Sequence, residues 1–349
     1  MARLLFHRAP QSFLLASEEA LTRSVGEKRA PITARLNIFD PPAVLVGYSQ
    51  DVFEEVNVEE ARRLGFEIGR RPTGGGAIVM DREATPGWEV WIPRDFPKLP
   101  SDVEGMYRFL SAVPIEALRY LGIDARFRPK NDIEVSGRKI SGTGLYTDGK
   151  GVMYCGTFLL DLDVSKMLRV LRIPIEKISD KAVKEVSRRI VTAREILGRV
   201  PPIERVLEAL KHGVESALGV ELELGDLNDY EKKLVAELEP RYRSEEWIYG
   251  FRRCQGFDRV CMYKTRGGLL RIHVKVSSGV LTQVMISGDM FVYPSRAVLD
   301  LEAFLKHTPV ESIVEEVERF FRESKSVVYG ISPRELGELI ARCCTQKSG

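Results

Sequence analysis

Cysteine and histidine are scarce in this chain, and neither occurs in the clusters typical of cross-links or metal sites. The 349 residues include five cysteines and four histidines. The cysteines form no Cys-x-x-Cys pair, and two of them are adjacent in sequence and do not easily bridge each other. This spacing argues against a disulfide framework and against a zinc site built on Cys155, Cys254, Cys261, Cys343 or Cys344.

Long apolar runs and a strong excess of one charge are also missing. No run approaches the roughly 18 apolar residues that span a membrane, and the N-terminal MARLLFHRAPQSFLL lacks the apolar core of a secretory signal. The 52 basic and 50 acidic residues give a formal net charge of +2, which does not suit a nucleic-acid coat protein. We therefore expect a cytoplasmic protein of two or three domains that contacts neither membrane nor nucleic acid.

Residues 132–163 are rich in glycine and β-branched residues. Their pattern predicts two or three antiparallel strands, with turns at Gly137 and near Asp148–Gly149. The composition changes near residues 220–230, which places a boundary between two structural units there. The first unit therefore contains β-structure that is interrupted by glycine turns.

The C-terminal part has the signals of a small α+β domain. Residues 269–276 and 280–287 alternate apolar and polar side chains around Ser-Ser-Gly, which predicts a hairpin. Residues 308–311 (Thr-Pro-Val-Glu) and 332–335 (Ser-Pro-Arg-Glu) each combine an N-cap, a proline at the first helical position and a capping-box glutamate. We expect a helix to begin at each of these two segments.

The segment RRPTGGGAIVMD, residues 70–81, places three glycines directly after two arginines. Glycine amides are not shielded by a Cβ atom and can approach an anion closely. Arg70 and Arg71 would add charge-assisted bonds to a phosphate or a carboxylate. A tight turn with solvated arginines explains the same residues equally well. No Gly-Lys-Ser/Thr follows, so this is not a Walker loop.

A second cluster, PKNDIEVSGRKISGTG, spans residues 129–144. Asn131 and Asp132 precede a predicted strand, and Lys139 lies on the strand that leaves the turn at Gly137. Taken alone, the Asn-Asp pair is explained by a turn and the lysine by an exposed hairpin. The glycines at 142 and 144 would let another group pass close to this backbone.

Together the two clusters resemble the lipoate-protein ligase family, within the biotin/lipoate ligase superfamily. The matching motifs are Arg-Pro-Thr-Gly-Gly-Gly-Ala at 71–77, Asn-Asp at 131–132, Gly-Arg-Lys-Ile-Ser-Gly at 137–142 and Gly-Thr-Phe-Leu-Leu at 156–160. The resemblance covers nearly the whole chain. It implies an α+β protein with a large catalytic domain at about 1–225, in which helices flank a mixed or antiparallel sheet. A smaller α+β accessory domain is expected at about 240–349.

The resemblance also implies an ATP-dependent lipoate-protein ligase. Such an enzyme activates lipoate, or octanoate, to an acyl-AMP with ATP and Mg²⁺. It then transfers the acyl group to a lysine on a lipoyl-acceptor domain of a 2-oxoacid dehydrogenase or on a glycine-cleavage H protein. Two anions must approach each other in the first step, so fixed cations and amide donors are expected to matter most.

The family's functional residues carry over to matching positions of this chain. Lys139 is the expected catalytic residue, Asp132 the expected Mg²⁺ ligand, and Val79 and Met80 the expected lining of the acyl pocket. The residues expected to bind the nucleotide or substrate are Arg71, Thr73, Gly74, Gly75, Gly76, Ala77, Asn131, Ser141, Gly142, Gly156 and Thr157.

The chain departs from the family pattern at two places. Met80 stands where the family usually has histidine, and Tyr154-Cys155 stands where histidine or similar polar residues are usual. One alternative is therefore an ATP-independent octanoyl or lipoyl transferase that uses Cys155 as a nucleophile. A degenerate paralogue that binds lipoyl domains or acyl ligands without turnover is the other, although such a protein has little reason to keep Lys139.

Overall fold

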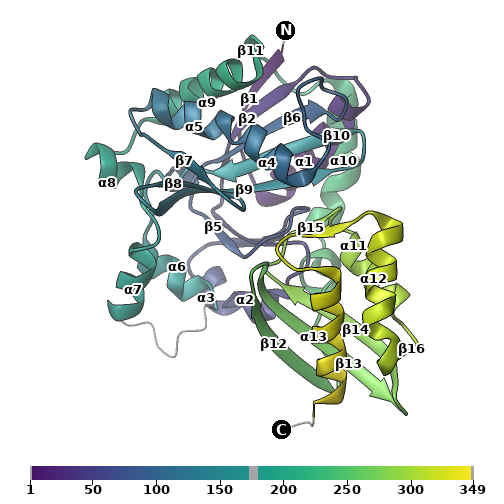
Figure 1. Cartoon of the computed structure of the whole chain (residues 1–349). Helices are drawn as coiled ribbons and strands as arrows, with labels where there is room; N and C mark the ends of the chain where they lie inside the picture. The colour runs from purple at the N-terminus through teal and green to yellow at the C-terminus, as the bar shows by residue number, and fades with distance from the viewer. Residues whose placement is uncertain (1, 173–179, 347–349) are drawn as a thin grey trace. The chain divides into compact units, whose positions relative to one another are not determined.

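The computed structural model describes residues 2–172 and 180–346 (Figure 1). These residues form two compact units, which we describe separately. The first unit comprises Met1–Leu45, Val56–Gly69 and Ile78–Ile248, and the second comprises Val46–Glu55, Arg70–Ala77 and Tyr249–Gly349. The glycine loop therefore belongs to the second unit. The predicted domains at 1–225 and 240–349 remain a prediction about independent folding.

The first unit is built on a mixed sheet with the order β11-β1-β2-β6-β10-β9-β8-β7. Strand β1 pairs in parallel with β2 and β11, and the other neighbours are antiparallel. The strands are β1 (Ala2–Ala9), β2 (Thr33–Phe39), β6 (Gly87–Pro93), β7 (Arg126–Arg128), β8 (Asp132–Val135), β9 (Arg138–Thr147), β10 (Gly151–Thr157) and β11 (Leu222–Leu224). The predicted mixed sheet is confirmed.

Helices cover both faces of this sheet, because successive side chains of a strand point to opposite faces. Met153 of β10 packs in one core cluster with Leu14 and Leu15 of α1. The next residue, Tyr154, faces the other way, with its ring 6.0 Å from that of Tyr107 in α4. The helices of the unit are α1 (Gln11–Gly26), α3 (Val58–Arg63), α4 (Val103–Leu110), α5 (Ala112–Tyr120), α6 (Val164–Val170), α7 (Asp180–Ser187), α8 (Ala193–Leu197), α9 (Ile203–Leu218) and α10 (Asp229–Arg243).

The predicted antiparallel strands of residues 132–163 are confirmed as β8, β9 and β10. The turn between β8 and β9 needs two left-handed residues, Ser136 at φ 50° and Gly137 at φ 79°. The turn before β10 contains Gly149 at φ 93°. Glycine adopts this conformation without the steric cost of a Cβ atom, so the sequence identified both turns correctly.

A small sheet of order β4-β3-β5 extends the first unit. Its strands are β3 (Ala43–Val46), β4 (Glu67–Arg70) and β5 (Ile78–Met80). Val79 pairs with Val44, and Met80 pairs with Ala43. In the chain, the glycine loop follows β4 and precedes β5.

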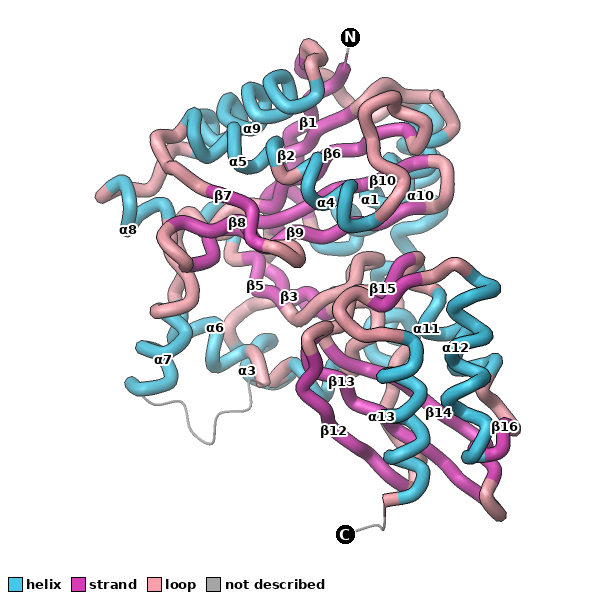
Figure 2. Tube along the Cα trace, viewed as in Figure 1, coloured by secondary structure: helices cyan, strands magenta, loops and turns pink. Residues whose placement is uncertain are grey.

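The second unit has a sheet of order β12-β13-β14-β16, and Figure 2 shows α13 lying along β12 and β13. The predicted hairpin is confirmed as β13 and β14. The elements are α2 (Val52–Glu55), β12 (Arg259–Thr265), β13 (Gly268–Ser277), β14 (Val280–Gly288), β15 (Val292–Tyr293), α11 (Ala297–Phe304), β16 (Thr308–Pro309), α12 (Ile313–Ser324), β17 (Val327–Val328) and α13 (Pro333–Thr345).

One of the two predicted C-terminal helix starts is correct. Ser332 is the N-cap of α13 and accepts a hydrogen bond from the Glu335 amide. The start predicted at Thr308 is wrong, because Thr308 pairs with Leu281 of β14. A 3₁₀ turn follows, and α12 begins only at Ile313. The strand pairing therefore overrides the local capping pattern.

The expectation of no disulfide is also wrong. Cys261 of β12 and Cys343 of α13 form one across 82 residues of sequence. The other three cysteines, Cys155, Cys254 and Cys344, form no disulfide bond. Within the described part of the chain, no helix combines the length and the apolar character needed to cross a membrane.

Candidate functional site

Lys139 and Asp132 form an ion pair on neighbouring strands of the first unit. Lys139 Nζ lies 2.8 Å from Asp132 Oδ1, and Arg128 donates to the other carboxylate oxygen over 2.5 Å. Burial alone would raise the pKa of the Asp132 carboxyl, but Lys139 and Arg128 hold this pKa below its ordinary value. Both carboxylate oxygens therefore already bind cationic groups. This arrangement does not fit a Mg²⁺ ligand, since the ion would meet two positive charges.

The Lys139 side chain leans over Gly142. A Cβ atom at Gly142 would lie 2.6 Å from Lys139 Nζ, so a larger residue there would displace the ammonium group from this position. Gly142 is paired with Asp132 across β8 and β9. The Lys139 backbone is held on both sides, since its amide donates to Arg189 and its carbonyl accepts from Val191, each over 2.9 Å. The position of this ammonium group is therefore well defined by the sheet.

Cys155 lies on the same face of the sheet as the Lys139 ammonium group. Cys155 of β10 is directly opposite Gly144 of β9. Directly paired residues point to the same face, and so do residues two apart on one strand. Gly142 and Gly144 therefore form a floor without side chains between the lysine and the thiol. Cys155 and Gly142 are diagonal neighbours across β9 and β10, and such neighbours lie roughly 7–8 Å apart. Cys155 is half-buried, with Sγ 3.6 Å from the Gly144 carbonyl oxygen.

A buried ion pair continues this row of the sheet on the other side of Cys155. Glu89 of β6 is paired with Cys155, and Arg35 of β2 is paired with Glu89. Arg35 Nε and Nη2 donate to the two Glu89 oxygens over 3.0 and 3.2 Å. The Asn37 amide also donates to Glu89. Arg35 is 0% exposed and Glu89 is 3% exposed. This ion pair was not predicted from the sequence, because each residue alone looks like an ordinary polar residue of a strand.

The other predicted binding residues of the first unit support the backbone around Lys139. The Asn131 amide donates to the Thr143 carbonyl and the Thr143 amide donates to the Asn131 carbonyl, each over 2.8 Å. Ser141 is fully buried. A Cβ atom at Gly156 would lie 2.7 Å from the Gly142 carbonyl oxygen, so β9 and β10 approach closely there. Thr157 is half-buried at the end of β10.

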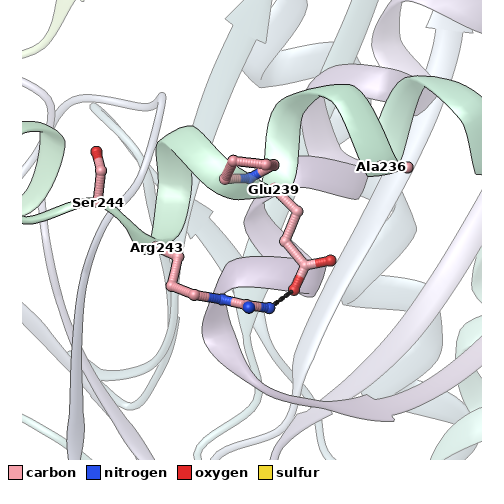
Figure 3. Close-up of a pocket in the computed structure, with 5 residues that line it drawn as sticks. Ala236, Glu239, Arg243 and Ser244 are labelled. Carbon is pink, nitrogen blue, oxygen red and sulfur yellow. Dashed lines mark hydrogen bonds and ion pairs between the residues drawn. The ribbon is translucent and has the colours of Figure 1, made fainter.

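The two residues expected to line the acyl pocket are mostly packed. Met80 is 2% exposed and belongs to the core cluster that contains Leu14 and Trp91, and Val79 is 8% exposed. A pocket of about 500 Å³ lies instead along α10. Figure 3 shows its lining, in which Arg243 pairs with Glu239. None of the predicted site residues lines this pocket, which Ala236, Glu239, Pro240, Arg243 and Ser244 form.

The glycine loop of the second unit is a packed turn stabilised by its own arginine. Arg71 donates to Thr73 Oγ1 over 2.9 Å and to the carbonyls of Gly74 and Gly76 over 2.9 and 2.7 Å. Gly75 has φ +92°, and its amide donates to the Met290 carbonyl over 3.2 Å. Ala77 ends the loop.

Arg70, the other arginine of the loop, is completely buried. Its guanidinium donates to the carbonyls of Gly47 and Tyr48, each over 3.1 Å, and to that of Gln50. Burial lowers the pKa of Arg70 to about 9. Contrary to the solvated arginines of the simple-turn interpretation, Arg70 and Arg71 therefore organise backbone carbonyls.

Sequence comparison identifies the group of proteins to which these features belong. The lipoyl protein ligase A/B catalytic domain family matches residues 10–215. Octanoyltransferase LipM from Kyrpidia tusciae is 32% identical over 260 residues, which cover 68% of this chain and 94% of that protein. Octanoyltransferase LipM from Bacillus subtilis is 30% identical over 266 residues, which cover 69% of this chain and 95% of that protein.

Solved structures of lipoate-protein ligases share the fold. A bi-partite lipoate protein ligase from Thermoplasma acidophilum, studied with its E2 lipoyl domain, superposes with a TM-score of 0.64 at 28% identity, covering 72% of this chain and 97% of that chain. Lipoate-protein ligase A bound with ATP superposes with a TM-score of 0.62 at 26% identity, covering 71% of this chain and 98% of that chain. A P. falciparum protein in complex with lipoate gives 0.76 over 99% of this chain and 100% of that chain, but its 17% identity shows likeness of fold alone.

These relatives correct the expected activity. The similar curated proteins are octanoyltransferases, so the expectation of an ATP-dependent lipoate-protein ligase acting through an acyl-adenylate is wrong. The alternative that the Cys155 position raised, an acyl transferase, agrees better with them. The expected lipoate-ligase fold is confirmed.

Proposed function

Because the chain belongs to the lipoyl protein ligase A/B catalytic domain family, we propose that it transfers octanoyl or lipoyl groups through a thioester on Cys155, without ATP. The observation that supports this proposal is the shared, glycine-floored face of Cys155 and Lys139. Cys155 is also the only cysteine in the sequence of residues 1–248. The acceptor is a lysine of a lipoyl domain, the kind of partner described for the bi-partite ligase.

The reaction takes two balanced acyl transfers. The Cys155 thiolate attacks the carbonyl carbon of a donor acyl thioester, and the carbon–sulfur bond to the donor breaks. The donor thiol leaves with the proton that Cys155 lost. The acceptor lysine amine then attacks the Cys155 thioester, forming an amide and returning a proton to the cysteine sulfur. The donor thioester is already activated, so no nucleotide is required.

Lys139 has the geometry to stabilise the charge that develops in both transfers. Each step passes through a tetrahedral intermediate whose oxygen carries a negative charge. The ammonium group stands over Gly142, on the face to which the Cys155 thiol points. Asp132 holds it in position over 2.8 Å, and Arg128 in turn holds Asp132. Lys139 therefore contributes a fixed positive charge that needs no reorganisation during the reaction.

The direct test is to omit ATP. The full-length protein is incubated with an octanoylated carrier protein and an apo lipoyl domain, and the acceptor is weighed by mass spectrometry. We expect the acceptor to gain one octanoyl group at the same rate with and without ATP and Mg²⁺. Free octanoate with ATP should give no product. A mass gain only from free octanoate and ATP would reject the proposal.

Replacing Lys139 by methionine is expected to lower kcat for octanoyl transfer by about 100- to 1,000-fold, the usual cost of losing one oxyanion donor. Methionine keeps the length of the side chain while removing the charge. The matched control is Lys150→Met, because Lys150 is exposed in the turn between β9 and β10. Steady-state rates at saturating donor separate kcat from KM. Equal rates for the two variants would show that Lys139 takes no part in the chemistry.

A further inference from the structure

The second unit contains a cluster of metal-binding side chains that lies outside the proposed acyl-transfer site. Glu54, Cys254 and His273 each present a ligand atom, and these atoms lie within 4.8 Å of one another. Glu54 comes from α2, Cys254 from the segment before β12, and His273 from β13. Helix α2 belongs to the second unit, where Arg271 of β13 forms an ion pair with Glu55 of this helix.

The atoms of the cluster are nearly in coordinating positions. His273 Nε2 lies 3.8 Å from Glu54 Oε1. Ligands on a tetrahedral Zn²⁺ ion, with bonds of roughly 2.0–2.3 Å, lie roughly 3.3–3.8 Å apart. A closure of about 1 Å by the Cys254 and Glu54 side chains would therefore satisfy this geometry. From the mixed sulfur, nitrogen and oxygen ligands, we propose that Glu54, Cys254 and His273 bind one Zn²⁺ ion.

Neighbouring groups already orient these ligands. The Asp51 carboxylate accepts from the Cys254 amide over 2.7 Å, which fixes the backbone that carries the thiol. The Ser287 hydroxyl donates to the Glu54 carboxylate over 3.3 Å. Outer contacts of this kind position ligands in known metal sites. His273 is 1% exposed, and within the described residues its Nδ1 atom has no hydrogen-bond partner.

The surroundings of Cys254 disfavour a nucleophilic role for this thiol. Burial, then Glu54 and Asp51, raise the pKa of the Cys254 thiol, so this cysteine is a poor nucleophile. A bound divalent ion deprotonates a coordinating thiol outright.

The nearby arginines offset the charge of Glu54 only in part. Arg271 forms its close ion pair with Glu55 and lies 3.7 Å from Glu54. Arg252 is paired with Glu302 over 2.7 Å. Zn²⁺ would neutralise the Glu54 carboxylate together with the thiolate of Cys254.

Zinc at this position would cross-link the segment Val46–Glu55, which packs against the glycine loop. The segment Val46–Glu55 that carries Glu54 also carries Gly47, where a Cβ atom would lie 2.1 Å from the Gly75 carbonyl oxygen. The Tyr48 amide donates to the Thr73 carbonyl over 2.9 Å. The ion would connect this segment to His273 of β13 and to Cys254. It would thereby hold in place the residues that contact the glycine loop, Gly47 and Tyr48. The inference is independent of the proposed acyl transfer.

The test uses the full-length protein stripped with a chelator. After dialysis with Zn²⁺, we expect one zinc per chain by elemental analysis, and with Co²⁺ a near-ultraviolet sulfur-to-cobalt absorption band. Cys254→Ser should remove this band. Cys254→Ser, His273→Gln and Glu54→Gln should each weaken Zn²⁺ binding at least ~100-fold, because even an outer contact is worth 10–100-fold. The matched controls Cys344→Ser and His307→Gln should bind like the original chain.

A second measurement does not depend on how the variants fold. At an alkaline pH at which the zinc-free, unaltered protein is alkylated at Cys254, Zn²⁺ but not Mg²⁺ should protect this residue, as located by peptide mass spectrometry. Protection of Cys254 with one bound zinc would support the proposal. The proposal is overturned if the chain retains no zinc, if the cobalt band persists in Cys254→Ser, or if Cys254 is alkylated at the same rate with and without Zn²⁺.

Discussion

Replacing Cys155 by serine is expected to lower the rate of octanoyl transfer by at least about 1,000-fold. A thiol is partly ionised near neutral pH, whereas a hydroxyl needs an adjacent base to remove its proton. Cys155 Sγ lies 3.6 Å from the Gly144 carbonyl, which accepts a hydrogen bond but cannot remove a proton. A serine hydroxyl is far less acidic than a thiol, so serine at this position would be a much weaker nucleophile near neutral pH.

Single-turnover transfer from an octanoylated carrier protein measures this effect. Without an acceptor, the unaltered chain should accumulate an octanoyl thioester on the peptide that contains Cys155. The control variant is Cys344→Ser, because Cys344 is a buried free thiol of the second unit. Unchanged transfer by Cys155→Ser, or an octanoyl group found on a different residue, would exclude Cys155 as the nucleophile.

The elements that could be predicted from sequence are those defined by local patterns. Gly137 and Gly149 marked turns because each occupies a left-handed conformation. Ser332 marked the start of α13 because its side chain caps an amide three residues later. Local patterns predict the wrong element where contacts with residues distant in sequence determine the secondary structure. Thr308 has the same capping pattern, but its pairing with β14 prevents a helix there.

The motifs also identified the residues around Lys139, but not the arrangement that supports transfer. The face shared by Lys139 and Cys155 depends on the register of β9 and β10, which no motif records. The ion pair of Arg35 and Glu89 joins residues 54 positions apart. The expected activity was wrong for a related reason. The glycine loop and the lysine were recognised by resemblance to ligases, and the relatives named octanoyltransferases lie within the same family.

Removing the charge of Arg35 is expected to lower the free energy of unfolding by about 3–5 kcal/mol, the cost of breaking a buried pair. Arg35 also donates to the Leu14 carbonyl and lies 5.1 Å from the centre of a Trp91 ring, so it links β2 to α1. Arg35→Met keeps much of the apolar volume of the side chain. It removes both Arg35 hydrogen bonds to the buried Glu89 carboxylate and leaves the one from the Asn37 amide. Urea denaturation monitored by circular dichroism measures the loss.

The double variant Arg35→Met/Glu89→Gln separates charge from packing. Glutamine removes the uncompensated charge, so the double variant should be more stable than Arg35→Met alone. The exposed pair of Lys28 and Asp95 is the control, and Lys28→Met should leave the denaturation midpoint unchanged.

The ion pair of Arg35 and Glu89 also bears on catalysis, because Glu89 is directly opposite Cys155. In Arg35→Met the unpaired carboxylate disfavours the neighbouring thiolate, so alkylation of Cys155 should shift to higher pH. If neither stability nor the alkylation profile changes, the ion pair neither stabilises the sheet nor influences the thiol.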